Sequence, residues 1–167
     1  MIILEKAKFS STQINLPESL REYIQVWIDK HIPLAFFDPT ESNGPDLHVT
    51  IKYGLHTQNV NDLIPVVKDF GPITVWLGTL SAFYNETDVL KIEVFSPDLH
   101  RLNKLICNNL EYTDTHLGYI PHITLGYLKK GTADPYIGKT DFNGIKFTSP
   151  FIWFSDTNEN KTKISLI

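Results

Sequence analysis

The sequence has a single cysteine, no long apolar run and little clustered basic charge, and each absence excludes a class of protein. Cys107 alone forms no internal disulfide and no zinc site built on several thiolates. The longest apolar runs, such as residues 32–37, are far shorter than the roughly 20 residues of a membrane-spanning helix. Glu5, Lys6 and Lys8 interrupt the first apolar stretch, unlike a signal peptide. We therefore expect a cytoplasmic protein with no membrane partner.

The charge balance is acidic: 15 Lys and Arg against 19 Asp and Glu give a formal net charge of −4. Proteins that hold long nucleic acid draw most of their affinity from Lys and Arg, and no basic run here exceeds Lys129-Lys130. We therefore expect no long nucleic acid partner, whereas a small phosphorylated ligand held by a few donors is compatible. The apolar fraction of 42% indicates one folded domain over residues 1–167, which we expect to be a monomer.

Strand-like and helix-like segments alternate along the chain. Residues 17–30 carry apolar side chains at helical spacing, and Ser96-Pro97 suits the start of a helix that runs to Leu110. A shorter helix is predicted over 61–70, with Pro65 near its first turns. Strands are predicted over the following ranges: 2–9, 47–55, 73–84, 89–95 and 119–128, with 145–154 and 161–167 as a closing hairpin. The order helix, loop, strand occurs twice, which indicates a weak internal duplication and an α+β fold with antiparallel sheets and helices packed outside.

Two strand-like segments carry the same motif. Residues 47–53 (LHVTIKY) and 121–127 (PHITLGY) align without a gap. Because residues i and i+2 of a strand point to one face, each motif places an imidazole beside a hydroxyl: His48 beside Thr50, and His122 beside Thr124. The aliphatic residues between and after them face the opposite, buried side. If the two halves pack about a pseudo-twofold axis, these four side chains converge on one cleft.

The chemistry of phosphodiester cleavage needs this set of groups. One group must remove a proton from the attacking oxygen and another must give a proton to the leaving oxygen, and two imidazoles with a pKa near about 6.5 can do both at neutral pH. Two Thr hydroxyls are fixed donors for the charge on the phosphoryl oxygens. A single His-x-Thr is also common in ordinary strands, where His packs and Thr favours the strand. Two copies in matching frames favour the functional interpretation.

The paired motifs resemble the 2H phosphoesterase superfamily, whose signature is two copies of His-hydrophobic-Thr/Ser-hydrophobic. The resemblance covers nearly the whole chain in segment order. It implies a bilobal, pseudo-twofold fold with a central cleft, in which His48 and His122 are the catalytic pair and Thr50 and Thr124 bind phosphate. It also implies a metal-independent enzyme that needs no cofactor. The second lobe departs from the first at residues 132–141, where little helical periodicity matches 61–70.

Four residues next to the motif histidines and threonines have open or weaker assignments. Lys52 shares the predicted face of Thr50, so it either reaches a phosphate or is a solvated lysine at the strand end. Gly126, its counterpart, leaves room for substrate. Tyr53 and Tyr127 fall on the opposite face and are predicted to pack in the core.

Other aromatic and polar residues allow a functional and a structural interpretation. Strand aromatics either stack on a base, worth about 1–3 kcal/mol each, or pack in the core: Trp76, Phe83 and Trp153. His116 lies close to the second motif and is predicted to line the entrance of the cleft. The remaining histidines share no spacing and are predicted at the surface: His31, His56 and His100. A metal site needs three or four ligands, so none is expected, and Cys107 is predicted to be a buried small residue.

The sequence leaves the substrate open. A 2′,3′-cyclic phosphate on a mononucleotide or RNA end, a cyclic di- or trinucleotide, and a 2′-5′ linkage are all compatible with the resemblance. Two alternatives from other classes are a nucleotide-binding module without turnover, which the intact motifs disfavour, and an RNA-end processing or ligase-like factor, which the net charge disfavours.

Overall fold

The computed structural model describes residues 9–41 and 46–167. Within these residues the chain forms three α-helices, two short 3-10 helices and eight strands. Their order is β1 (Ser10–Asn15), α1 (Glu18–His31), η1 (Leu34–Phe36), β2 (His48–Leu55), α2 (Val60–Val67), β3 (Ile73–Tyr84), β4 (Asp88–Phe95), α3 (Pro97–Asn109), β5 (His122–Leu128), η2 (Asp134–Tyr136), β6 (Lys146–Ser149), β7 (Phe151–Ser155) and β8 (Lys161–Ser165). No helix of the described part combines the length and apolar character needed to cross a membrane.

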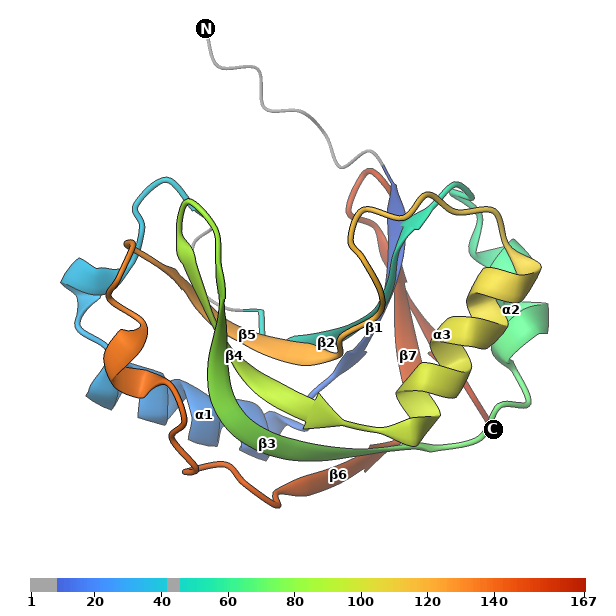
Figure 1. Ribbon diagram of the computed structural model, residues 1–167. Coiled ribbons are helices and arrows are strands. Elements are labelled where there is room, and N and C mark those ends of the chain that lie inside the picture. Colours follow the sequence, from blue (N-terminus) through green and yellow to red (C-terminus); the bar gives the residue numbers. More distant parts are fainter. Residues whose placement is uncertain (1–8, 42–45) are drawn as a thin grey trace, which may run out of the picture.

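All eight strands belong to one antiparallel sheet with the order β6-β3-β4-β5-β2-β1-β7-β8. The two motif strands, β2 and β5, are neighbours at its centre and pair through Val49 and Ile123. Three further strands flank each of them, so we call β2, β1, β7 and β8 the His48 half and β5, β4, β3 and β6 the His122 half. The sheet curls into a trough with the helices outside it (Figure 1). The predicted α+β fold with outer helices is confirmed, and the sheet is continuous across its two halves.

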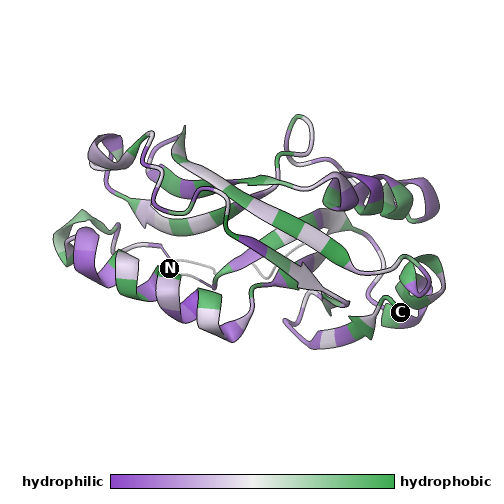
Figure 2. Ribbon diagram, turned by 90° about the horizontal axis from the view of Figure 1, so that it is seen from below, coloured by the Kyte–Doolittle hydropathy of each residue, from purple (hydrophilic) through white to green (hydrophobic). Residues whose placement is uncertain are grey.

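The helices pack on the convex side of the sheet, where the apolar core lies. In α1 the buried residues are Ile24, Trp27 and Ile28, and in α3 they are Leu99, Leu102 and Ile106. Ser96 caps α3 as predicted, because its hydroxyl accepts a hydrogen bond from the Leu99 amide at 3.1 Å. Polar and apolar residues alternate along the strands in the view from below (Figure 2), which leaves one face of the sheet for the core and the other for the trough.

The helix that leads to each motif strand also holds the other half of the sheet. Trp27 on α1 donates a hydrogen bond to Asp141, at 2.9 Å, and its ring meets Phe142 edge-on at 5.3 Å between ring centres. Both partners lie in the connection between β5 and β6, which belongs to the His122 half. On α3, the Asn103 amide donates to the Ile51 carbonyl of β2 at 2.7 Å. These exchanged contacts fix the two motif strands relative to each other.

Four segments differ from the sequence prediction. The predicted strand over 2–9 falls almost wholly outside the described residues, and the first strand described is β1, at 10–15. Because β1 buries the polar residues Ser10, Thr12 and Gln13, it lacks the hydrophobic pattern of a buried strand. Hydrogen bonds satisfy these polar side chains, for example Ser10 Oγ, which donates to the Thr57 carbonyl at 2.6 Å. The helix predicted over 61–70 ends at Val67, and the strand predicted from 119 begins at His122.

The fourth difference concerns the C-terminal hairpin. The segment predicted as one strand over 145–154 is two strands, β6 and β7, separated by Pro150. β6 pairs with β3, whereas β7 pairs with β1 and β8 on the far side of the sheet. Proline cannot donate to a strand ladder, so a break at this position follows from its chemistry. The hairpin itself is confirmed for β7 and β8.

Candidate active site

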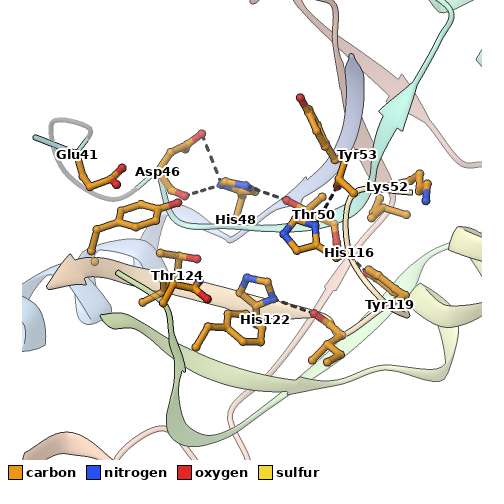
Figure 3. A pocket seen from close by; sticks show the side chains of 18 of the residues that line it. Glu41, Asp46, His48, Thr50, Lys52, Tyr53, His116, Tyr119, His122 and Thr124 are labelled. Atoms are coloured by element: carbon orange, nitrogen blue, oxygen red, sulfur yellow. Dashed lines mark hydrogen bonds and ion pairs between the residues drawn. The ribbon is translucent and has the colours of Figure 1, made fainter. Parts of the chain in front are cut away.

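Four motif side chains converge on one cleft. His48 and Thr50 from β2 and His122 and Thr124 from β5 line an open cavity of about 1800 Å³ in the trough of the sheet, and Figure 3 shows the four of them around a common space. Val49 and Ile123, which pair between them, are fully buried on the opposite side. The alternation predicted from the motifs therefore holds at these positions.

Each imidazole is oriented by a backbone carbonyl two residues before it. His48 Nδ1 lies 2.5 Å from the Asp46 carbonyl oxygen, and His122 Nδ1 lies 2.8 Å from that of Ile120. A carbonyl oxygen can only accept, so both Nδ1 atoms carry a proton. Each Nε2 is therefore the atom left for proton transfer. Thr50 Oγ1 lies 3.3 Å from Nε2 of His48, so this hydroxyl and this imidazole act on the same point in the cleft.

The environment of His122 favours its neutral form. The ring is half-buried, and Phe83 packs edge-on against it at 5.0 Å between ring centres. Burial lowers the pKa of His122, the hydrogen bond to its backbone carbonyl partner opposes that shift, and the positive charge of Lys91 and of the imidazoles of His48 and His116 lowers the pKa further. A neutral imidazole with a free Nε2 is a proton acceptor.

The environment of His48 differs, because a carboxylate lies beside it. Besides the carbonyl, the carboxylate of Asp46 lies 3.6 Å from Nδ1 of His48. Lys161 shares this carboxylate at 3.2 Å. The two histidines are thus related by sequence but differ in their surroundings.

The segment between α3 and β5 closes one side of the cleft. Tyr119 donates its hydroxyl to the Thr50 carbonyl at 2.8 Å, and burial raises the pKa of Tyr119 well above its usual value. The amide of Thr113 donates to the carbonyl of Gly54, whose φ of +103° and close approach to this segment leave no room for a Cβ. His116 is exposed and lines the cleft, which confirms its predicted position at the entrance.

A β-bulge in each motif strand changes the face assignment after the threonines. In β2, Thr50 pairs with Gln13 and Lys52 pairs with Thr12, so Ile51 has no partner of its own. Alternation therefore shifts by one residue, and Tyr53 joins Lys52 in the cleft lining beyond Thr50. Lys52 donates to Asp114 at 2.7 Å and lies 4.3 Å from the ring centre of Tyr112. Lys52 therefore lines the same cleft as His48 and Thr50, and its contact with a phosphate remains a prediction.

The same bulge occurs in β5. Thr124 pairs with Lys91 and Gly126 pairs with Leu90, which leaves Leu125 as the extra residue. Tyr127 consequently lines the cleft and is only half-buried, as is Tyr53 in β2, so the prediction that both pack in the core is wrong. Gly126 leaves room for the ring of Phe37, since an added Cβ would lie 2.7 Å from that ring, and both residues line the cleft.

Of the three strand aromatics, only Phe83 lines the cleft. Trp76 lies near Phe95, at 5.9 Å between ring centres, outside the cleft lining. Trp153 pairs with Gln13, which pairs with Thr50, so its side chain continues the row of Thr50 two strands away. Base stacking by either tryptophan remains a prediction.

The other singled-out residues have structural surroundings. His56 and His100 are exposed as predicted, whereas His31 is half-buried and stacks on Trp27 at 4.6 Å. Cys107 is half-buried, and burial raises the pKa of its thiol. Among residues 9–41 and 46–167, no three His, Cys, Asp or Glu side chains are grouped closely enough to hold a metal ion.

Sequence reasoning missed three groups that surround the pair. The Asp46 carboxylate follows a turn-rich loop, and nothing in its pattern distinguishes it. Tyr119 lies three residues before the second motif histidine, and its hydrogen bond to the first motif strand depends on tertiary packing. Lys91 alternates with buried Leu90 and Ile92 in β4, which signals a polar face, but only the pairing with Thr124 places it at the site.

The fold and the paired His-x-Thr strands are those of a two-histidine phosphoesterase. A family model described as the 2′-5′ RNA ligase superfamily matches residues 16–148. The chain belongs to this superfamily, within the 2H phosphoesterases. No curated protein sequence matches it.

Solved structures share this fold over almost the whole chain. TT0787 of Thermus thermophilus is 17% identical with a TM-score of 0.67, covering 95% of this chain and 97% of that one. E. coli LigT complexed with 3′-AMP is 19% identical with a TM-score of 0.66, covering 98% and 97%. Usb1 of Kluyveromyces marxianus with uridine monophosphate is 11% identical with a TM-score of 0.55, covering 95% and 97%.

Proposed function

We propose that this protein is a metal-independent phosphodiesterase that cleaves a diester in a small nucleotide or at an RNA end. One observation carries the proposal: two imidazoles, each oriented through Nδ1 by a backbone carbonyl, present Nε2 to one cleft together with two Thr hydroxyls. LigT with 3′-AMP and Usb1 with uridine monophosphate support a small nucleotide as the kind of ligand.

We assign the base to His122 and the acid to His48. The attacking oxygen, from water or a ribose hydroxyl, gives its proton to Nε2 of neutral His122 as it forms a bond to phosphorus. The bond from phosphorus to the leaving oxygen breaks, and that oxygen takes a proton from Nε2 of protonated His48. Thr50 and Thr124 donate hydrogen bonds to the phosphoryl oxygens during this step. The lowered pKa of His122 and the carboxylate beside His48 support this direction.

The substrate class is tested by incubating the protein with EDTA and three kinds of phosphodiester. The panel contains 2′,3′-cyclic mononucleotides, cyclic dinucleotides and 2′-5′ oligonucleotides, and chromatography identifies the products. We expect turnover of at least one of them in EDTA, because imidazoles and hydroxyls supply the proton transfer and charge stabilisation that a metal supplies elsewhere. The cleft of about 1800 Å³ has space for more than a mononucleotide, so we include all three sizes.

The outcomes separate the proposal from its alternatives. Activity that disappears in EDTA and returns with zinc or manganese would contradict metal independence. Binding of nucleotides without turnover of any panel member would favour a nucleotide-binding module. Joining of RNA ends in place of cleavage would favour a ligase-like factor.

A further inference from the structure

The paired bulges place one buried polar side chain beside each motif threonine. In the His48 half, Thr50 pairs with Gln13 of β1, and in the His122 half, Thr124 pairs with Lys91 of β4. Directly paired residues of an antiparallel ladder point to the same face, so both side chains lie on the trough side of the sheet. Gln13 is 6% exposed and Lys91 is 5% exposed. The two halves are therefore equivalent in backbone but differ here by one positive charge.

The two side chains also differ in charge and in the partners that offset the cost of their burial. Gln13 is neutral, and its amide donates to Asn15 at 2.7 Å. The Lys91 ammonium donates to Ser81 Oγ at 2.5 Å and lies 4.5 Å from the ring centre of Phe83. None of the ion pairs among the described residues includes Lys91.

A buried ammonium without an anionic partner is costly. Burial lowers the pKa of Lys91, and the nearby charge of Glu93 opposes that shift. Glu93 is exposed and accepts a hydrogen bond from Thr79 at 3.0 Å, so it does not neutralise the ammonium directly. The other titratable neighbour is His122, whose pKa the Lys91 charge lowers. Lys91 thus adds positive charge to the side of the cleft where Thr124 is expected to hold a phosphate.

We propose that Lys91 is a positioning residue whose charge attracts the phosphate to the Thr124 side of the cleft and makes the two halves inequivalent. This inference rests on the proposed function, because the phosphate that it binds is the one at the two histidines. Lys91 lies beside Thr124 and Phe83 and acts on the phosphate through the electrostatic field of its ammonium. It donates no proton in the reaction. By the same field it favours the neutral form of His122, and so orients the substrate with its attacking oxygen toward His122.

The test measures binding of inorganic phosphate to the folded protein, with no turnover involved. In Lys91→Gln the lysine is replaced by the side chain that the other half uses at the equivalent position, which makes misfolding less of a concern. At low ionic strength, we expect phosphate affinity to fall by about tenfold and the pKa of the His122 imidazole, followed by NMR, to rise. If Lys91 had only a structural role, its replacement would neither lower phosphate affinity nor raise the pKa of His122. Lys91→Met, neutral and of similar length, should behave in the same way.

Lys52→Gln is the matched control, since it removes the same charge from the motif strand β2, where Lys52 lines the cleft but is already paired with Asp114. It should change phosphate affinity by no more than about twofold. Equal losses in the two lysine variants, unchanged affinity in both Lys91 variants, or no phosphate binding by the wild-type protein would each overturn the inference. Phosphate binding that depends on Lys91 in a protein that cleaves no diester would support the inference and overturn the proposed function.

Discussion

Replacing either His48 or His122 by alanine is expected to lower the rate of phosphodiester cleavage by about 10²–10⁴, the usual contribution of one general acid or base. Each imidazole lines the same cleft and is held through Nδ1 by a backbone carbonyl, so each variant removes one proton-transfer group and leaves the other in place. The double variant should lose little more than either single one, because groups that act as a unit are not additive. Steady-state kinetics on the preferred substrate of the panel measures all three.

His56→Ala is the matched control, because His56 is exposed and contacts Thr113 and Glu111 rather than the cleft floor. Its rate should stay within a few-fold of wild type. A His122→Ala variant that retained near wild-type activity would contradict the pairing, and so would losses that multiply in the double variant.

Trp27→Ala is expected to lower the free energy of unfolding by about 3–5 kcal/mol, the usual cost of truncating a buried Trp. Trp27 is 6% exposed, donates to Asp141 and contacts the rings of His31, Tyr136 and Phe142. It thus joins α1 to the connection that follows β5 by a hydrogen bond and by ring contacts. Denaturant unfolding, followed by circular dichroism, measures the change.

Two variants separate this contact from general effects on α1. Val26→Ala alters the neighbouring, 63% exposed position and should change stability by less than about 0.5 kcal/mol. Trp27→Phe keeps most of the packing and loses the hydrogen bond, so it should fall between them. If Trp27→Ala were no less stable than Val26→Ala, the exchanged packing of α1 would not hold the halves together.

The convergence of the motifs could be predicted from the sequence because it depends on two local rules. Alternation along a strand puts His beside Thr, and an ungapped repeat puts both pairs in the same frame. The buried Val49 and Ile123, which pair at the centre of the sheet, show that both rules hold. The helices were predictable for a similar reason, since the cap at Ser96 and the apolar spacing of α1 are local.

The residues beyond each Thr could not be placed, because a bulge is a property of two strands. Nothing in the sequence around Ile51 or Leu125 shows that these residues have no partner in the adjacent strand. Each such bulge nevertheless shifts the alternation of the residues that follow it. The shift brings Tyr53 and Tyr127 to the cleft, which Lys52 also lines. It also places Lys91, which no motif marks, beside Thr124.

β1 escaped prediction for a different reason. Hydrophobic periodicity assumes that buried strand positions are apolar, but β1 buries Ser10, Thr12 and Gln13 in the middle of the His48 half. Hydrogen bonds of the Ser10 and Thr12 hydroxyls with the backbone of Thr57 and Lys52 make this burial tolerable. Such compensation is visible only once the pairing is known.

The division of labour between the two histidines is tested most directly with an activated leaving group. A nucleoside 3′-nitrophenyl phosphate releases an oxygen that needs no acid, whereas the matching alkyl ester needs one. We expect His48→Ala to be rescued toward wild-type rates on the nitrophenyl ester and to stay impaired on the alkyl ester. His122→Ala should stay impaired on both, because the attacking oxygen still needs a base. Equal deficits of the two variants on the nitrophenyl ester would contradict the assignment, and full activity of both on the alkyl ester would contradict two-histidine catalysis itself.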